Sequence, residues 1–435
     1  MIQLKLNKLK FLDPIKRVAK RWIAFQRAVH RQMQPKLKTY STRPGRNKWA
    51  LLCYLLDAVD MKDSDSRFKG HANWWRGREI ARILDSLGYN VDVIASGDGS
   101  TVPHRQYDLV FDASSNLPRL APFQKPNTKY VLLLTGSYYG WSGPAEARRI
   151  LDFERNHGVL YTPRNARMPK DLMDKTISIA DLSLLIGNDV TLSTYPEWAR
   201  TRMKTVQMPT SEINHKKVYP TTFRENKKMG VFLYYSSARN VSKGLDLLFD
   251  AFYRHPEWTL NVVGPVESSE ADFLRAYPDL HNQSNIRLHG SLLASSDRFA
   301  RILDESEAVL FPSCTEGTSS SVLTCLRGGI YPIVSRNTGV DLPEGTGIWI
   351  ETLTVSGVER AILSFLEKDG TSISEEAEMI RARIEERHSR ETFTKNMTAI
   401  LSDVDRCPKK GFDPVVLRAY EQSIPPEIRN SPLFG

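Results

Sequence analysis

Short apolar runs alternate with amphipathic stretches along most of the chain. In the first half these runs lie between Ala50 and Gly187 and read ALLCYLL, VDVIA, DLVFDA, YVLLLTG and DLSLLIG. Their length and their continuous apolar character predict buried strands. The stretch 76–87 places its apolar residues on one face of a predicted helix that Gly88 ends. Strands alternating with helices predict a parallel sheet that is covered on both faces.

The same pattern starts again after a polar stretch with two prolines at 209–228. The runs GVFLYYSS, LNVVGP, NIRLHG, AVLFPS and YPIVS follow in turn. Two successive α/β units predict two Rossmann-like, doubly wound domains that face each other across a cleft, with ligands at the carboxyl ends of the strands. We place an N-terminal domain at 47–215 and a C-terminal domain at 216–390. A C-terminal helix and tail at 391–435 is expected to return to the N-terminal domain.

The N-terminal segment, residues 1–46, differs from the rest of the chain in charge. It holds thirteen Lys or Arg and one acid, which gives this segment a net charge of +12. The net charge of the whole chain is +10, so the remaining residues sum to −2. Nucleic-acid binding by the whole protein is therefore not indicated. Residues 13–33 place Trp22 and Phe25 on an apolar stripe among cations, which predicts an amphipathic helix on an anionic membrane surface. Packing on the protein's own body or on a partner subunit is the alternative, and residues 35–47 are interpreted as a linker.

The cysteine content and the hydropathy of the chain indicate the cellular compartment. The four cysteines show no metal-ligand spacing and favour core positions over disulfides. The longest apolar run, WALLCYLLDAV, is interrupted by Asp57 and is shorter than the roughly 18 residues of a membrane span. No signal peptide is evident. We expect a cytoplasmic protein, with peripheral binding to the inner face of a membrane through residues 1–46 as an option.

The segment AVLFPSCTEGTSSSVLTCLRGGIYPIVS, residues 308–335, is the strongest candidate for chemistry. A buried strand ends at Phe311, Glu316 follows in the loop, and small residues from Gly317 to Ser321 open a helix. Free N–H groups at a helix start, with hydroxyls beside them, suit a diphosphate. Glu316 can accept hydrogen bonds from sugar hydroxyls. A serine-rich N-cap with an incidental acid is the alternative reading.

Two motifs in the second half carry a family resemblance. FPSCTEG with SVLTCLRGGIYPIVS resembles the donor-site signature of glycosyltransferase family 4, in which two glutamates eight positions apart flank a phosphate-binding helix start. SSARNVSKGLDLLFDAF, from Ser236, resembles the basic motif that opens the C-terminal domain of that family. The resemblance covers about residues 230–400. It implies the GT-B fold, with two Rossmann-like domains and a nucleotide-sugar donor bound by the C-terminal one.

The resemblance also implies residue roles in this sequence. Glu316 would be the catalytic contact to the transferred sugar, and Arg239 and Lys243 would neutralise the donor diphosphate. The remaining implied contacts are Gly317, Thr318, Ser319 and Ser320 for the diphosphate, and Gly264, His289 and Gly290 for the nucleotide base and ribose. The chain departs from the family at Thr324, which stands where the second glutamate binds the ribose hydroxyls. Thr324 therefore leaves a non-catalytic relative as an alternative.

The implied reaction is retaining sugar transfer without a protein nucleophile. Positive charge holds the leaving diphosphate while the acceptor attacks from the same face, so the contribution of the protein is electrostatic and positional. Neither a metal nor another cofactor is expected. Asp63–Ser64–Asp65 has a metal-site spacing, but it lies in a polar stretch and is interpreted as a solvated turn.

Two stretches of the N-terminal domain are expected to face the cleft. HANWWRGRE places His71, Asn73 and Trp74 in a loop between the first strand and the first helix, and Gly136 and Ser137 follow the strand YVLLL. Aromatic and amide groups suit carbohydrate, so these five residues are candidate acceptor or sugar contacts. An ordinary loop with a buried Trp is the alternative.

The motifs favour a hexosyltransferase-like enzyme that acts on a glycan or lipid-linked acceptor in surface polysaccharide or glycoconjugate synthesis. A nucleotide-sugar epimerase of the same architecture is the first alternative, and it would need carboxylates and histidines concentrated in the cleft. A transferase-like binding module without activity is the second. Fold similarity does not identify the sugar, the nucleotide or the acceptor.

Overall fold

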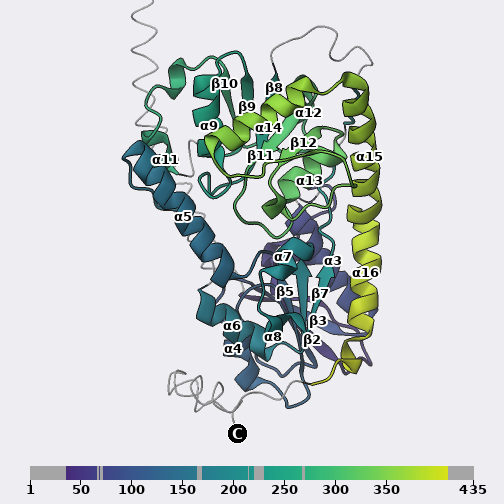
Figure 1. Cartoon of the computed structure of the whole chain (residues 1–435). Helices are drawn as coiled ribbons and strands as arrows, with labels where there is room; N and C mark the ends of the chain where they lie inside the picture. Colours follow the sequence, from purple (N-terminus) through teal and green to yellow (C-terminus); the bar gives the residue numbers. More distant parts are fainter. Residues whose placement is uncertain are drawn as a thin grey trace, which may run out of the picture.

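The computed structural model describes residues 36–65, 68, 72–163, 169–213, 215–219, 230–266 and 270–409 and shows two α/β domains, one above the other in Figure 1. The predicted amphipathic helix at 13–33 lies outside the described residues. No described helix is long and apolar enough to cross a bilayer.

Seven strands form the sheet of the N-terminal domain, in the order β1-β3-β2-β4-β5-β6-β7. Their bounds are β1 (Leu37–Ser41), β2 (Trp49–Tyr54), β3 (Asn90–Ala95), β4 (Leu109–Asp112), β5 (Lys129–Leu134), β6 (Leu182–Ile186) and β7 (Met203–Val206). Strands β2 to β7 are parallel. The apolar runs predict β2 to β6, whereas β7, with the sequence MKTV, was not predicted because two of its four residues are exposed.

The linker interpretation of residues 35–47 is wrong for its first part. Strand β1 pairs antiparallel with β3 at the edge of the sheet, and Thr39 Oγ1 donates to Asp92 Oδ1 at 2.7 Å. Residues 37–41 lack a long apolar run because an edge strand is covered on fewer sides than a central one. The apolar pattern of the central strands therefore does not extend to β1.

The helices of the N-terminal domain flank this sheet. They are α3 (Ala72–Ser86), α4 (Leu117–Leu120), α5 (Tyr139–His157), α6 (Lys170–Ile179), α7 (Asp189–Ser193) and α8 (Glu197–Arg200), with short 3-10 turns η1 (Leu56–Val59) and η2 (Ala121–Phe123). Helix α3 begins about one turn before the predicted helix at 76–87. Asn73 and Trp74, expected in a loop, therefore lie in the first turn of α3.

Six parallel strands form the sheet of the C-terminal domain, in the order β10-β9-β8-β11-β12-β13. Their bounds are β8 (Val231–Tyr235), β9 (Thr259–Val263), β10 (Ile286–Gly290), β11 (Ala308–Phe311), β12 (Tyr331–Val334) and β13 (Ile348–Trp349). The chain runs outward from β8 to β10 and then returns to β11 on the other side of β8. This reversal is the place where doubly wound sheets bind ligands.

The helices of the second half are α9 (Leu245–Arg254), α11 (Ala271–Arg275), α12 (Asp297–Glu305), α13 (Ser320–Arg327), α14 (Val355–Glu367), α15 (Gly370–His388) and α16 (Arg390–Ser402), with 3-10 turns η3 (Leu280–Asn282), η4 (Arg336–Thr338) and η5 (Val404–Arg406). Helices α15 and α16 run along both domains in Figure 1. Helix α15 packs on α13, whereas α16 contacts α3 and β7 of the first sheet.

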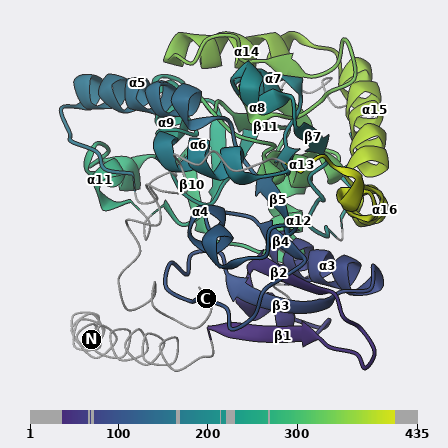
Figure 2. The same ribbon diagram turned by 90° about the horizontal axis from the view of Figure 1, so that it is seen from below.

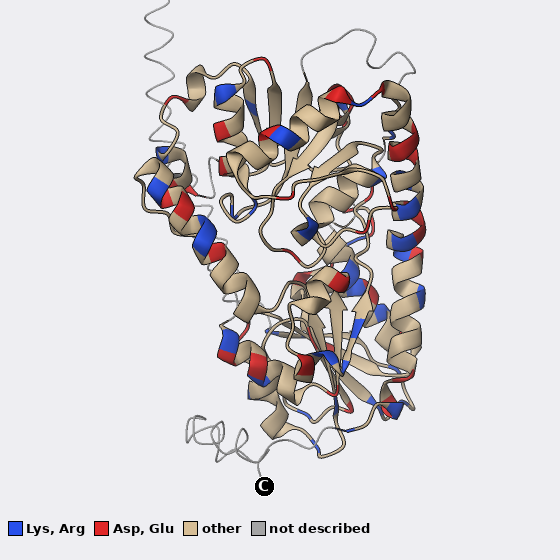
Figure 3. Ribbon diagram, in the orientation of Figure 1, with Lys and Arg blue, Asp and Glu red and all other residues tan. Residues whose placement is uncertain are grey.

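Helix α5 also joins the two domains. It begins after β5 and extends to α9 and α11 in both views (Figures 1 and 2). Its buried Arg149 binds Asp246 of α9 at 2.5 Å, and Phe153 stacks on Phe273 with 5.8 Å between ring centroids. Figure 3 shows that cations and acids alternate along α5 and α15, so neither helix presents charge of one sign. The two domains are therefore held by buried contacts as well as by the chain connection.

Candidate functional site

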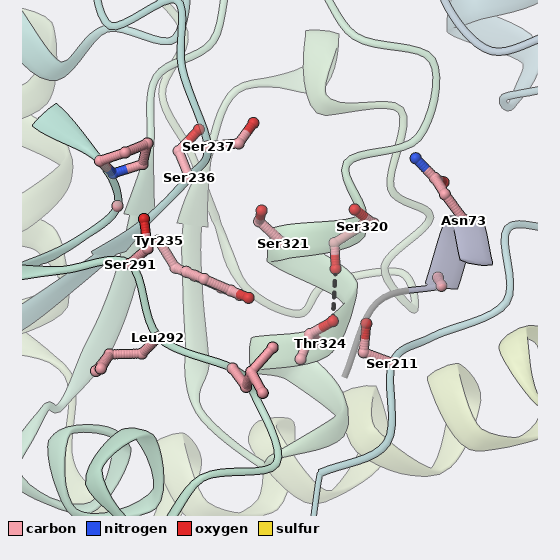
Figure 4. A pocket seen from close by; sticks show the side chains of 14 residues that line it. Asn73, Ser211, Tyr235, Ser236, Ser237, Ser291, Leu292, Ser320, Ser321 and Thr324 are labelled. Atoms are coloured by element: carbon pink, nitrogen blue, oxygen red, sulfur yellow. Dashed lines mark hydrogen bonds between the residues drawn. The ribbon is translucent and has the colours of Figure 1, made fainter. Parts of the chain in front are cut away.

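A cavity of about 400 Å³ lies between the two domains. The C-terminal domain lines it with residues that follow β8, β9 and β10 and with the start of α13, and the N-terminal domain adds α3 and Ser211 (Figure 4). The lining residues are Ala72, Asn73, Ser211, Tyr235, Ser236, Ser237, Gly264, Pro265, Ser291, Leu292, Leu293, Ser320, Ser321 and Thr324. The cavity thus occupies the carboxyl ends of the strands, where the sequence predicts a ligand.

The chemistry of the lining is neutral and rich in hydroxyls. None of these described lining residues carries a carboxylate or an imidazole. Burial raises the pKa of Tyr235 to about 12, so its phenol stays protonated at neutral pH. The cavity can therefore hold a polar ligand by hydrogen bonds, and its lining offers no acid–base pair.

The start of α13 forms one wall of the cavity. Ser319 is the N-cap residue, and its side chain accepts a hydrogen bond from the Val322 N–H at 3.4 Å. Ser320 and Ser321 follow in the first turn and face the cavity, while Thr318 is half-buried in the preceding loop. The first amides of a helix have no partners within the helix and carry partial positive charge. This wall can therefore bind an anionic group.

Thr324 lies on the same wall, one turn further along α13. Its side chain is almost fully buried, and its hydroxyl donates to the Ser320 carbonyl at 2.7 Å (Figure 4). The hydroxyl hydrogen is thus committed to the helix backbone, and only the lone pairs of the oxygen can face a ligand.

The motifs assign Gly264, His289 and Gly290, from the loops after β9 and β10, to the nucleotide base and ribose. Of these three described residues, Gly264 alone lines the cavity. Gly264 lines the cavity, and a side chain there would collide with the Ser236 carbonyl. Its N–H donates to the Gly290 carbonyl at 2.9 Å, so Gly290 supports the wall without lining it. His289 contacts Asn261 Oδ1 at 3.0 Å and is also outside the lining. Burial and then Arg298 lower the pKa of His289.

Sequence reasoning missed the serines at the strand ends. Ser236 and Ser237 directly follow β8, and Ser291 directly follows β10. The sequence contained a signal for them, because they follow apolar runs, and residues at the carboxyl ends of parallel strands are the ones that contact ligands. Ser211 had no such signal because it comes from the polar connection between the domains.

Glu316 and Lys243 lie together, as the family resemblance implies. Lys243 Nζ is 3.6 Å from Glu316 Oε1. Gly244 makes this approach possible: its φ is 74°, and a side chain there would strike the Pro312 carbonyl. The loop after β8 therefore packs directly against the loop after β11.

The loop that holds Glu316 is also bound by the N-terminal domain. Ser137 Oγ donates to the Glu316 carbonyl at 2.7 Å, and Thr191 Oγ1 donates to the Gly317 carbonyl at 2.8 Å. A Cβ atom on Gly317 would lie 2.5 Å from the Ile186 carbonyl oxygen and 2.6 Å from that of Thr135. Only glycine fits between the two domains at this position.

Arg239 has an unusual backbone and an acidic partner. Its φ of 67° lies in the left-handed region, and the Glu270 carboxylate accepts from the N–H groups of Arg239 and Asn240 at 2.8 Å each. Its guanidinium pairs with Glu146 of α5. Strained backbone of this kind persists where the surroundings over-determine it, often at functional sites. In this structure the guanidinium thus contacts the N-terminal domain, and neither Arg239 nor Lys243 lines the cavity.

The candidate contacts of the N-terminal domain fall into separate places. Asn73 lines the interdomain cavity. Trp74 lines a second cavity of about 560 Å³ at the ends of β2 and β3, and Gly136 and Ser137 line a third of about 160 Å³. His71 lies outside the described residues. One of the four described residues thus reaches the interdomain cavity.

The described residues contain no group of three or more His, Cys, Asp or Glu side chains placed to hold a metal ion. Asp63 pairs with Arg78 on the surface. The four cysteines are unpaired with one another.

Comparisons with known proteins agree with this arrangement. Residues 230–368 match the family model described as Glycosyl transferases group 1. Sucrose-phosphate synthase from Thermosynechococcus elongatus superposes with a TM-score of 0.59 at 14% identity, over 83% of this chain and 100% of that one. HepE from Anabaena, in complex with UDP-glucose, gives a TM-score of 0.51 at 14% identity, over 82% and 99% of the two chains. A search of curated protein sequences finds no match.

These findings confirm two sequence predictions. The two-domain arrangement is the GT-B fold, and residues 230–368, which include both motifs, match the model of a glycosyl transferase family.

Proposed function

We propose that this GT-B glycosyltransferase binds a nucleotide-sugar donor in the interdomain cavity and transfers the sugar, with retention of its configuration, to a glycan or lipid-linked acceptor. We place the reaction in surface polysaccharide or glycoconjugate synthesis. The observation that carries the proposal is the position of the cavity, at the carboxyl ends of β8 to β10 and the start of α13. Hydroxyls and helix-start amides there match the hydrogen-bonding groups of a nucleotide sugar.

The donor diphosphate would lie against the start of α13, near Lys243. In the ligand-free molecule, Glu316 is the acidic partner of Lys243 and Glu146 that of Arg239. A diphosphate brings negative charge of its own and can replace these carboxylates as the partner of either cation. Cations and helix amides then stabilise the leaving diphosphate, so that the proposed reaction uses neither a metal nor another cofactor.

The epimerase alternative receives no support from the cavity. Epimerisation needs groups that remove and return a proton, whereas the described lining contains hydroxyls, one amide and apolar groups. The same lining suits transfer from a donor whose leaving group is already anionic.

The acceptor would enter from the side of the N-terminal domain. The cavity beside Trp74 lies at the ends of β2 and β3 and includes Tyr54 and Asp57. An aromatic face and a carboxylate are suitable groups for a sugar ring and its hydroxyls. Membrane binding through residues 1–46 stays part of this proposal, because it would bring the protein to lipid-linked acceptors.

Donor hydrolysis provides the test of the proposed function. The full chain would be incubated with UDP-glucose, ADP-glucose and GDP-glucose, and with the corresponding galactose and mannose donors. Release of nucleoside diphosphate from at least one donor is expected. Conversion to a new sugar isomer without release would support the epimerase, and failure to bind or cleave any donor would contradict the proposal. The HepE complex makes UDP-glucose the first donor to test.

Replacing Lys243 with alanine should weaken nucleoside diphosphate binding by about ten- to over a hundred-fold, the scale of a hydrogen bond to a charged group at roughly 1.5–3 kcal/mol. Calorimetry with UDP measures the effect. Lys368→Ala is the matched control, since Lys368 pairs with Glu376 and neither residue lines the cavity. Equal affinity of the two variants for UDP would place the diphosphate elsewhere.

Thr324 should bind ribose weakly, because its hydroxyl hydrogen is bonded to Ser320. The unmodified protein is expected to show less than about a tenfold preference for UDP over 2′-deoxy-UDP, and Thr324→Glu should increase this preference, because a carboxylate accepts stronger hydrogen bonds. Competition binding with the two nucleotides measures the ratio. A strong preference in the unmodified protein would assign the ribose contact to another residue.

A further inference from the structure

Arg76 is a buried cation that has no acidic partner among the described residues. It lies on α3 with 2% of its surface exposed. Its guanidinium donates to the Tyr54 hydroxyl, from Nε at 2.9 Å and also from Nη2, to Asn73 Oδ1 at 3.0 Å and to Met208 Sδ at 2.8 Å. All three partners are neutral. In the part of the chain that the structure describes, no carboxylate forms an ion pair with Arg76.

A lone buried cation is unfavourable for folding. Removing a charge from water carries a desolvation penalty that a nearby opposite charge usually offsets. Neutral hydrogen-bond acceptors compensate for only part of it, and a thioether sulfur is a weak acceptor. An anion that binds near Arg76 would supply the missing charge, so the arrangement favours an anionic ligand over an empty site.

The position of Arg76 connects it to the interdomain cavity. Asn73 lies one turn earlier on α3 and lines the cavity, opposite the start of α13 (Figure 4). A guanidinium has only donors, so the atom of Asn73 that it contacts must be the oxygen. The amide nitrogen is then on the other branch of the side chain, and Figure 4 shows it on the side of the cavity. Arg76 thereby determines which atom of the Asn73 amide faces the cavity.

We propose that Asn73 is a donor-binding residue from the N-terminal domain and that Arg76 is its positioning residue. Asn73 donates a hydrogen bond from its amide nitrogen to an oxygen of the nucleoside diphosphate sugar. Arg76 holds the amide in this orientation and places a positive charge behind the cavity wall. The inference rests on the proposed function and adds to it: hydrogen-bond donors from both domains converge on one anionic ligand.

A purely structural role for Arg76 would give different results. As a staple between α3 and the end of β2, Arg76 would contribute to stability and have no effect on the ligand. As a positioning residue, it is required for ligand affinity, and its charge lowers the stability of the empty protein. Measuring stability and affinity in the same variants separates the two roles.

Asn73→Asp is the first test. The new carboxylate would stand beside the Arg76 guanidinium and form a buried ion pair, so the melting temperature should stay equal or rise. The same change removes the N–H donor and adds a negative charge to the cavity wall. The Kd for UDP-glucose should therefore increase at least about tenfold. Asn282→Asp, an exposed site in η3, is the control for the added charge.

Arg76→Met is the second test. It keeps the length of the side chain and removes the charge, so the melting temperature should not fall. The Kd for UDP-glucose and the KM for its hydrolysis should rise at least about tenfold. Arg82→Met is the matched control, since Arg82 lies on the same helix, is half-exposed and pairs with Glu79. Arg76→Lys should recover part of the affinity because it restores the charge.

The outcomes separate this inference from the function on which it rests. If the unmodified protein binds UDP-glucose and the folded Asn73→Asp and Arg76→Met variants bind it within twofold of that affinity, the inference is wrong and the proposed function stands. A large drop in melting temperature in both variants would also overturn it, in favour of the structural role. Failure of the unmodified protein to bind any donor in the panel would overturn the proposed function, and this inference with it.

Discussion

Replacing Glu316 with glutamine should lower turnover by about 100-fold or more while the protein stays folded and still binds nucleotide. The loss is on the scale of removing a charge-assisted contact from a transition state. Glutamine has the same shape, and the Glu316 backbone carbonyl keeps its hydrogen bond from Ser137, so the loop should hold its position. Lys243 would lose the carboxylate that lies 3.6 Å from its Nζ. Binding of UDP should therefore be unchanged or tighter.

Steady-state kinetics measures the turnover, with the donor that the hydrolysis panel selects. Calorimetry measures the affinity for UDP. Glu344→Gln is the control, because Glu344 is exposed and does not line the cavity. Turnover within a few-fold of the unmodified enzyme would remove Glu316 from the site. Loss of UDP binding together with turnover would mean that Glu316 supports the loop and does not contact the sugar.

Replacing Gly317 with alanine should have an effect of comparable size for a steric reason. The added methyl would meet the carbonyl oxygens of Ile186 and Thr135, both from the N-terminal domain. Neither backbone can yield easily, because Ile186 ends β6 and Thr135 directly follows β5. The two domains would separate locally, and the loop with Glu316 would move. A displacement of about 1 Å in a catalytic group can reduce the rate about 100-fold.

The expected signature of Gly317→Ala is a loss of turnover with a modest loss of stability, since each sheet keeps its own core. Kinetics, thermal melting and small-angle scattering together measure turnover, stability and domain separation. Gly99→Ala is the control, because a Cβ at Gly99 meets no atom within 4 Å. Normal turnover with unchanged scattering would show that the interface accommodates the added methyl and would contradict this prediction.

The family motifs identified the start of α13 as one wall of a candidate site, but they did not predict the acidic partner of Arg239. Glu316 and Lys243 are close together because they lie in the loops that follow β11 and β8, two neighbouring strands of one parallel sheet. The motif match could not show that Arg239 pairs with Glu146 of α5. That contact depends on how far α5 extends toward α9, which is a property of the assembled domains.

The candidate contacts of the N-terminal domain also could not be placed from the sequence alone. Asn73 and Trp74 are adjacent in sequence, yet they line different cavities. Both were assigned to a loop because the apolar periodicity of α3 becomes clear only after its first turn. In a helix, consecutive side chains point in directions about 100° apart, so neighbours in sequence readily face different surfaces. Placing them correctly required the helix start and its orientation toward the second domain.

The sequence by itself determined the two α/β domains and the hydroxyl-rich start of α13 after a buried strand, because both follow from local periodicity or from residues contiguous along the chain. The GT-B fold was predicted from the resemblance of two motifs to a known family. Only the tertiary structure decided that β1 completes the first sheet, that Glu146 pairs with Arg239, and that Asn73 lines the interdomain cavity and binds Arg76. These features depend on contacts between segments from different parts of the chain, and the free energy of such contacts is set by packing and burial, which no local pattern encodes.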